Sequence, residues 1–209
     1  MKALTGFVVF LCFLCGTLPG MAGEPLEAAV EQAMRDSFRS ATPQEWRTRL
    51  DQDEVQRLCS RHRNDPPPDV AARIAELSGA DYKYPQDGKL LGDWKNGEQL
   101  ASSGRGGHIG KIQPDPAGRK KGGNCYACHQ LAKSEVAAGN LGPSLSRYAE
   151  KRGTSADAVK YVYQKIFNAQ AFFPCSQMPR FGHNEWLTPE EIADTVAFLL
   201  DPESPVNKE

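Results

Sequence analysis

The sequence predicts a mostly α-helical protein. Apolar side chains recur at three- and four-residue intervals in several segments, and no segment has the alternating apolar pattern of a β-strand over a useful length. The chain has 209 residues, of which 40% are hydrophobic and 24% charged, a composition typical of a globular protein. Its 25 basic and 26 acidic residues leave a net charge of −1, so no basic excess exists to bind a nucleic acid.

The first segment has the features of an export signal. Lys2 precedes an apolar run at residues 7–18, and Gly20-Met21-Ala22 places small residues where a signal peptidase cuts. The run is shorter than the roughly 18 to 20 apolar residues of a membrane-spanning helix. Lipid attachment at Cys15 is disfavoured, because the two residues before it are bulky. We therefore expect residues 1–22 to be a signal peptide, the mature chain to be periplasmic, and no membrane span to remain.

Residues 23–89 are predicted to form an N-terminal helical extension. Apolar residues recur at helical spacing after Glu24, and Thr42-Pro43-Gln44-Glu45 has the cap and proline of a helix start. The expected elements are helices at residues 24–38, 42–59 and 70–77, followed by a loop at residues 78–92.

The main domain is predicted at residues 90–209. Asp93 can cap a first helix, and a glycine-rich segment at residues 102–123 follows as a long loop insertion. Thr188 opens the last helix with a capping pattern. The later helices are expected at residues 155–168 and 188–200.

The loop insertion leads directly into the pattern Cys-x-x-Cys-His, which is typical of covalent haem attachment. Residues three apart on a helical turn lie side by side, so Cys125 and Cys128 can bond the two vinyl groups of one haem. His129 follows as an iron ligand. A redox dithiol would follow a strand and has no use for the histidine, and a zinc site would need two more ligands at short spacing. The pattern predicts one covalently bound haem c.

The second axial ligand decides whether the iron is open to small molecules. Met178, in a loop between two predicted helices, is the candidate. A thioether favours ferrous iron and raises the reduction potential. His183 is the alternative ligand and would lower the potential. His62 and His108 stand in polar segments and are expected to be solvated.

Two further residues are candidates for contacts around the haem. The carbonyl of Pro143 can accept the proton of the second imidazole nitrogen of His129, although an ordinary Gly-Pro turn also explains this segment. The planar guanidinium of Arg180 can pair with a haem propionate.

Cys59 and Cys175 remain after haem attachment takes the other two cysteines of the mature chain. An exported chain seldom keeps two idle thiols, so we predict a disulfide between them. Two free thiols or a bond to another subunit are the alternatives, because the sequence does not give the distance between their Cα atoms.

Taken together, the Gly-Asp helix start, the Cys-x-x-Cys-His pattern, the GPSL turn, the methionine loop and the terminal helix IADTVAFLL resemble a class I cytochrome c domain. More specifically, GGNCYACHQ, GPSLSRYAEKRG and NAQAFFPCSQMPRFGHNEWLTPEEIADTVAFLLDPESPVN resemble SoxX, the monohaem subunit of the SoxAX cytochromes of sulfur-oxidising bacteria. The resemblance covers about residues 90 to 207. Carried over by motif, the haem attachment and axial ligands of that family fall on Cys125, Cys128, His129 and Met178.

The resemblance implies a periplasmic heterodimer with a SoxA-like cytochrome subunit. In that family SoxA is understood to join thiosulfate oxidatively to a cysteine of the SoxYZ carrier protein. SoxX receives the electrons and passes them to a downstream cytochrome. The chain would then be a non-catalytic electron-transfer subunit of an L-cysteine S-thiosulfotransferase complex. The helices at residues 24–78 and the insertion depart from the compact form of the family, which leaves the partner surface open.

Two other functions stay open at this stage. One is a stand-alone periplasmic electron carrier, and the other is a haem enzyme or sensor with an open sixth position. An open position would need a distal acid or base, for which only His183 and Arg180 stand near the methionine in the sequence.

Overall fold

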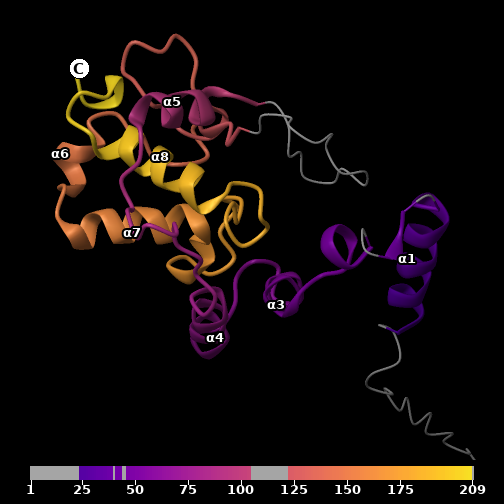
Figure 1. Ribbon diagram of the computed structural model, residues 1–209. Coiled ribbons are helices and arrows are strands. Elements are labelled where there is room, and N and C mark those ends of the chain that lie inside the picture. The colour runs from indigo at the N-terminus through magenta and orange to yellow at the C-terminus, as the bar shows by residue number, and fades with distance from the viewer. Residues whose placement is uncertain (1–23, 40, 44–45, 105–121, 209) are drawn as a thin grey trace, which may run out of the picture. The chain divides into compact units, whose positions relative to one another are not determined.

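The computed structural model describes residues 24–39, 41–43, 46–104 and 122–208 (Figure 1). These residues form helices, turns and loops without a β-strand, so the predicted mostly α class is confirmed. No helix in this part of the chain is long and apolar enough to cross a membrane. The predicted signal peptide, His108 and most of the loop insertion lie outside the described residues.

The chain divides into two compact units, Met1–Thr42 and Pro43–Glu209. In the first unit the structure describes mainly α1, Glu24–Ser37, which matches the helix predicted there. Its apolar Leu26 and Val30 are exposed, and Arg35 pairs with Glu31 one turn away at 2.6 Å.

The second unit begins with a break that the sequence analysis missed. The predicted helix at residues 42–59 is wrong, because one turn of π-helix at Trp46–Leu50 ends and α3, Glu54–Arg61, starts anew. Asp53 caps α3, since its carboxylate accepts a hydrogen bond from the Gln56 amide while the Gln56 side chain accepts one from the Asp53 amide. This reciprocal capping box favours a new helix start over a continuous helix.

The predicted third helix is present as α4, Pro68–Ser78, and it packs on α3. Between them lies a small apolar cluster, which includes the buried Val55, Cys59 and Ile74. Residues 43–89, assigned by sequence to an extension, thus belong to the same compact unit as the main domain.

The framework of that domain is the crossing of α5, Trp94–Ser102, with α8, Pro189–Leu200. The two helices meet at Gly97, where an added Cβ would lie 2.0 Å from the Asp194 carbonyl oxygen and 2.8 Å from the Phe198 Cβ. Only glycine permits this approach. Asp93 and Thr188 cap the two helices as predicted.

A third helix, α7, Ala156–Phe167, is capped by Ser155 and packs against α8. The short helix α6, Tyr148–Arg152, and one-turn 3-10 helices at Cys125–Ala127, Ala169–Ala171 and Pro205–Asn207 complete the unit. The core formed by these helices is apolar, and burial of each large side chain in it stabilises the fold by about 1.5–3 kcal/mol. Its most buried members include Val162, Tyr163, Phe167, Ile192, Val196 and Leu200.

Candidate haem site

The Cys-x-x-Cys-His segment forms one tight turn against this core. Asn124, with a left-handed φ of 51°, leads into the 3-10 turn at Cys125–Ala127. The amide of His129 then donates to the Cys125 carbonyl at 2.9 Å. Cys125 and Cys128 are both free thiols. The turn therefore presents two thiols and an imidazole within five consecutive residues.

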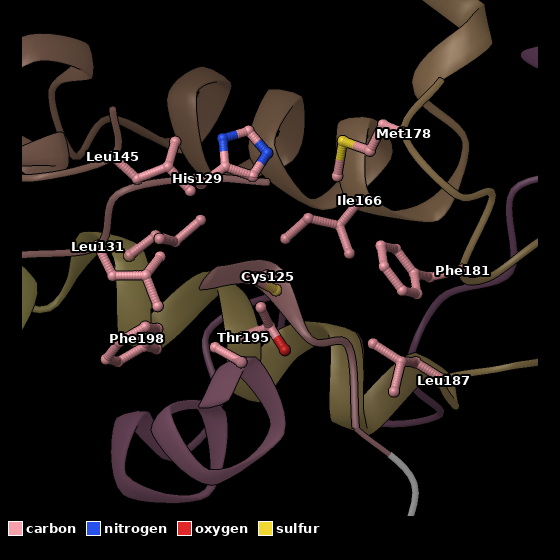
Figure 2. Close-up of a pocket in the computed structure, with 12 residues that line it drawn as sticks. Cys125, His129, Leu131, Leu145, Ile166, Met178, Phe181, Leu187, Thr195 and Phe198 are labelled. Carbon is pink, nitrogen blue, oxygen red and sulfur yellow. The ribbon is translucent and has the colours of Figure 1, made fainter. Parts of the chain in front are cut away.

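One cavity is lined by Cys125, His129 and Met178 together (Figure 2). The only other polar side chain in its lining among the described residues is Thr195, whose hydroxyl donates to the Glu191 carbonyl at 2.9 Å. The remaining lining is apolar and comes from α5, α7, α8 and the loops between them. These residues are Ala101, Leu131, Leu145, Ile166, Phe181, Leu187, Phe198 and Leu199. An apolar cavity with soft and imidazole donors suits a haem macrocycle.

The imidazole of His129 is oriented by the turn that follows it. Its Nδ1 lies 2.7 Å from the Pro143 carbonyl oxygen. A carbonyl can only accept, so Nδ1 carries the proton and Nε2 has a free lone pair. A Cβ on Gly142 would lie 2.2 Å from the ring, which explains a glycine at this position. The hydrogen bond expected for Pro143 is present.

Met178 reaches the cavity from the loop between the turn at Ala169–Ala171 and α8. Its side chain is half-buried, and its amide donates to the Ser176 hydroxyl at 3.3 Å. The fold thus brings the thioether to the same cavity as His129, as the sequence analysis expected.

Arg180 has a different partner from the predicted propionate. Its side chain is 7% exposed, and its guanidinium donates to the Asp53 carboxylate at 2.6 Å. It does not belong to the lining of the cavity. The N-terminal extension thus supplies a carboxylate that satisfies the buried cation, and pairing of Arg180 with a propionate stays a prediction.

His183, the alternative ligand, also points elsewhere. Its Nδ1 lies 3.1 Å from the Asp81 carboxylate and its Nε2 lies 3.6 Å from that of Asp53. Because both ring nitrogens face carboxylates, the geometry favours Met178 as the residue opposite His129. His62 ends α3 and lies outside the cavity lining.

The charged neighbours determine the electrostatics of Asp53. Partial burial raises the pKa of its carboxyl, but the His183 imidazole, the Gln56 amide and the Arg180 guanidinium together lower it more. The net result is a pKa well below its ordinary value of 3.8. The carboxylate is therefore ionised throughout the neutral range.

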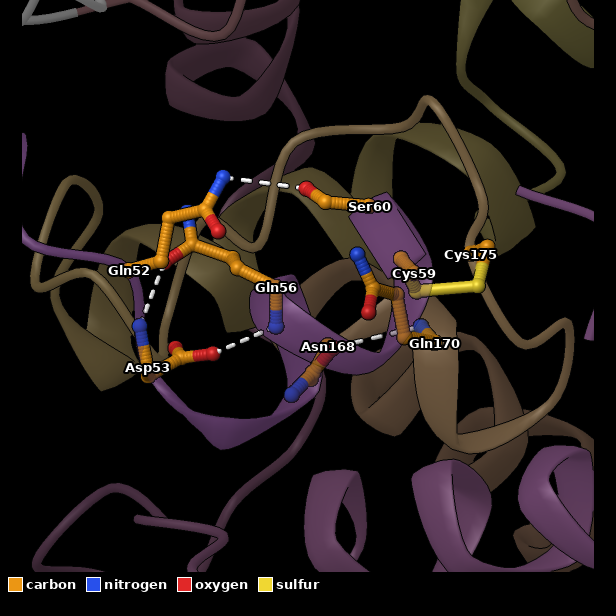
Figure 3. Close-up of a disulfide and its surroundings, with 8 residues drawn as sticks. All are labelled: Gln52, Asp53, Gln56, Cys59, Ser60, Asn168, Gln170 and Cys175. Atoms are coloured by element: carbon orange, nitrogen blue, oxygen red, sulfur yellow. Dashed lines mark hydrogen bonds between the residues drawn. A yellow bond between two sulfur atoms is a disulfide. The ribbon is translucent and has the colours of Figure 1, made fainter. Parts of the chain in front are cut away.

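Cys59 in α3 and Cys175 form a disulfide, with their Cα atoms 5.4 Å apart (Figure 3). Of the pairings that the sequence left open, the structure contains the intrachain bond. Both cysteines are buried in the apolar cluster between α3 and α4.

Burial raises the pKa of the Cys125 thiol to about 12. The thiols of redox dithiols, by comparison, ionise easily. The described residues also contain no group of three or more His, Cys, Asp or Glu side chains that could hold a metal ion.

Sequence reasoning missed Asp53 and Trp186. The pattern Asp53-Glu54-Val55-Gln56 is a capping signal, and attention to it would have found the start of α3. The indole nitrogen of Trp186 is buried and has no hydrogen-bond partner among the described residues, and its ring packs edge-on against Phe181 in the cavity lining.

Comparison with known proteins gives the family. A family model described as cytochrome c matches residues 117–201, which contain the cysteine motif, Met178 and α8. The chain is also 45% identical over 159 residues to an uncharacterized lipoprotein of Aquifex aeolicus (strain VF5). That alignment covers 75% of this chain and 73% of the relative. Residues 117–201 of the chain are a cytochrome c domain.

As a class I cytochrome c, the protein is an electron-transfer haem protein. It binds haem c covalently, and the iron of that haem is its redox metal. A cytochrome c domain also indicates that the protein is exported. The residues that line the cavity around His129 have the apolar, imidazole and thioether side chains that suit a haem.

Proposed function

We propose that one haem c is attached through thioether bonds to Cys125 and Cys128, with His129 and Met178 as its axial ligands. The observation that carries this proposal is that the imidazole and the thioether line the same apolar cavity. When bound, the haem supplies a one-electron iron couple. With protein donors on both of its faces, the site relays electrons and has no position for a substrate.

The other residues of the site hold and shield this group. The Pro143 carbonyl keeps the proton on Nδ1 of His129, which leaves Nε2 as the donor to the metal. The soft thioether of Met178 favours the ferrous state and so raises the potential. The apolar lining excludes water, which further tunes the potential.

The cytochrome is, in this proposal, the electron-accepting subunit of a SoxAX-type complex. The support is the resemblance of its cysteine, GPSL and methionine segments to SoxX. Coupling of thiosulfate to a carrier thiol forms a sulfur–sulfur bond and releases one proton and two electrons. A single haem takes one electron at a time, so this chain would pass two electrons singly to a downstream cytochrome for each thiosulfate.

The test is thiosulfate-dependent reduction of the native complex. The complex is isolated from the source cells by a tag on this chain, and a second cytochrome is expected to co-purify. Adding thiosulfate together with the carrier protein should reduce the haem of this chain within the complex. The same mixture with the carrier cysteine alkylated is the control and should leave it oxidised. Reduction of the haem by thiosulfate without the carrier protein would contradict the SoxAX role, and so would a haem that stays oxidised when both are present.

Purification and carbon monoxide binding test the two alternatives. A stand-alone carrier would elute without a second cytochrome and would still have both axial ligands. A haem enzyme or sensor would bind carbon monoxide rapidly in the ferrous state at neutral pH, because one axial position would be open. Unchanged ferrous spectra under carbon monoxide support the carrier function.

The proposed location is the periplasm, after a signal peptidase cleaves the chain near Ala22 and removes residues 1–22. The description of the Aquifex relative as a lipoprotein makes membrane anchoring the alternative. Cys12 and Cys15 are the leader cysteines that a lipid could modify, and a leucine precedes each where a small residue is preferred. Intact mass of the mature protein distinguishes the two, because cleavage near Ala22 removes both cysteines while lipidation retains the modified cysteine and everything after it.

A further inference from the structure

The segment from Asp53 to Lys83 runs beside the loop that carries Met178. Contacts on both sides of the methionine in the sequence join the two. They are the Cys59–Cys175 disulfide, the Asp53–Arg180 and Lys83–Glu185 ion pairs, and the contacts of His183 with Asp81 and Asp53. In addition, α4 packs on the turn at Ala169–Ala171, just before the loop.

These contacts differ greatly in strength. Lys83 and Glu185 are 59% and 75% exposed, and an exposed ion pair contributes little. The disulfide is covalent and buried within the cluster between α3 and α4. The Arg180 guanidinium is almost fully buried, and its 2.6 Å contact with Asp53 satisfies a charge that would otherwise lack a partner. The anchors that count are therefore at Cys175 and Arg180, three residues before and two residues after Met178.

We propose that Asp53 and Cys59, both supplied by the N-terminal extension, are positioning residues for the axial methionine. The inference rests on the proposed ligation by Met178. Neither residue lines the cavity, so each acts only through the loop. This assigns a function to α3 and α4, which the cytochrome c family match at residues 117–201 does not include.

The physical reason is the effective concentration of the thioether. Between the turn at Ala169–Ala171 and Pro189, where α8 begins, the loop has no regular helix to hold it. Fixing the chain at residues 175 and 180 restricts the volume that the Met178 sulfur can explore, so a broken bond to the metal is remade quickly. Without the anchors, an external ligand would compete more successfully for the same position.

The experiment compares ligand exchange in three holoproteins. Cys59→Ser/Cys175→Ser removes the disulfide without leaving an unpaired thiol, and Asp53→Asn removes the charge while keeping a side chain that can cap α3. Cyanide is added to the ferric proteins, and loss of the methionine-to-iron charge-transfer band is followed in time. We expect cyanide to displace methionine about tenfold faster in each variant than in the wild type, in line with losses at supporting residues of metal sites.

Val206→Ala is the matched control, because it removes buried apolar atoms from the turn at Pro205–Asn207, away from the methionine loop. It should lower thermal stability and leave the cyanide rate near that of the wild type. If both anchor variants exchange no faster than this control, the positioning inference is overturned while ligation by Met178 stands. If the wild type lacks the charge-transfer band, the proposed ligation and the inference both fail. Should the double serine variant fail to accumulate, Asp53→Asn alone decides between these outcomes.

Discussion

The carbonyl oxygen of Pro143 accepts a hydrogen bond from Nδ1 of His129 at 2.7 Å. This one contact decides which imidazole nitrogen can bind a metal, because the proton on Nδ1 leaves the lone pair on Nε2. The ring also lies so close to Gly142 that no side chain fits between them. The orientation of the His129 ring is therefore set by Gly142 and Pro143, which come before the methionine loop in the sequence.

Gly142→Ala is expected to displace the imidazole, since its Cβ would lie 2.2 Å from the His129 ring. The thioether bonds at Cys125 and Cys128 should keep the haem attached, while the ferric spectrum shifts from low spin to high spin. Gly79→Ala is the control, because a Cβ there meets nothing closer than 3.4 Å. A low-spin spectrum in Gly142→Ala would contradict the orientation that we assign to His129.

Met178→Ala should open one axial position while the haem stays bound. We expect a lower midpoint potential, because a soft ligand that favours ferrous iron is lost, together with rapid carbon monoxide binding. Potentiometry and ferrous difference spectra measure the two effects. Ile166→Val trims another residue of the cavity lining and should change neither. An unchanged potential in Met178→Ala would count against the assigned ligand.

The disulfide should contribute strongly to the free energy of unfolding, because it joins residues 116 apart in the sequence. In the chain-entropy model such a loop stabilises the folded state by about 4–5 kcal/mol. Urea unfolding of Cys59→Ser/Cys175→Ser against the wild type measures the difference. Mass spectrometry of the unreduced protein should recover the Cys59 to Cys175 cross-link, and alkylation of both thiols without reductant would exclude it.

Stability should depend on Asp53 at acid pH. The pKa of the Asp53 carboxyl is lower in the folded state than its ordinary value of 3.8. At pH values below about 4 the unfolded chain therefore binds a proton at this carboxyl more readily than the folded chain does. The stabilisation is thus present above about pH 4 and is lost as the pH falls further. Asp53→Asn should cost about 1.5–3 kcal/mol at neutral pH, as for a hydrogen bond to a charged group, and its unfolding free energy should converge with that of the wild type as acid is added. A constant difference from pH 6 to pH 2 would disagree with the Asp53–Arg180 pairing.

The helices of the domain could be predicted because their signals are local. Asp93 and Thr188 cap helices as the sequence indicates, and the helix predicted at residues 155–168 is present as α7. The cysteine motif is equally local, and the hydrogen-bond partner of His129 was predicted from a Gly-Pro turn only a short distance along the chain.

The partners of the methionine loop were harder to predict because they are distant in sequence. Arg180 and Asp53 are 127 residues apart, and nothing in the residues near Arg180 distinguishes a propionate partner from a carboxylate partner. The break before α3 was missed for a related reason. Asp53 both caps α3 and pairs with Arg180. The capping box can be predicted from neighbouring residues, whereas the ion pair cannot.

The Cys59–Cys175 bond has a consequence for how this protein matures. On export from the N-terminus into an oxidising compartment, Cys59 would be the first cysteine after the proposed signal peptide to emerge, Cys125 and Cys128 the next, and Cys175 the last. Joining cysteines in order of arrival would trap an attachment thiol in the wrong bond. For the haem attachment proposed above, Cys59 and Cys175 would have to oxidise while Cys125 and Cys128 stay reduced. Maturation in this order would require α3 to dock beside residues 169–175 before the bond forms, or a thiol reductant that reverses wrong pairings.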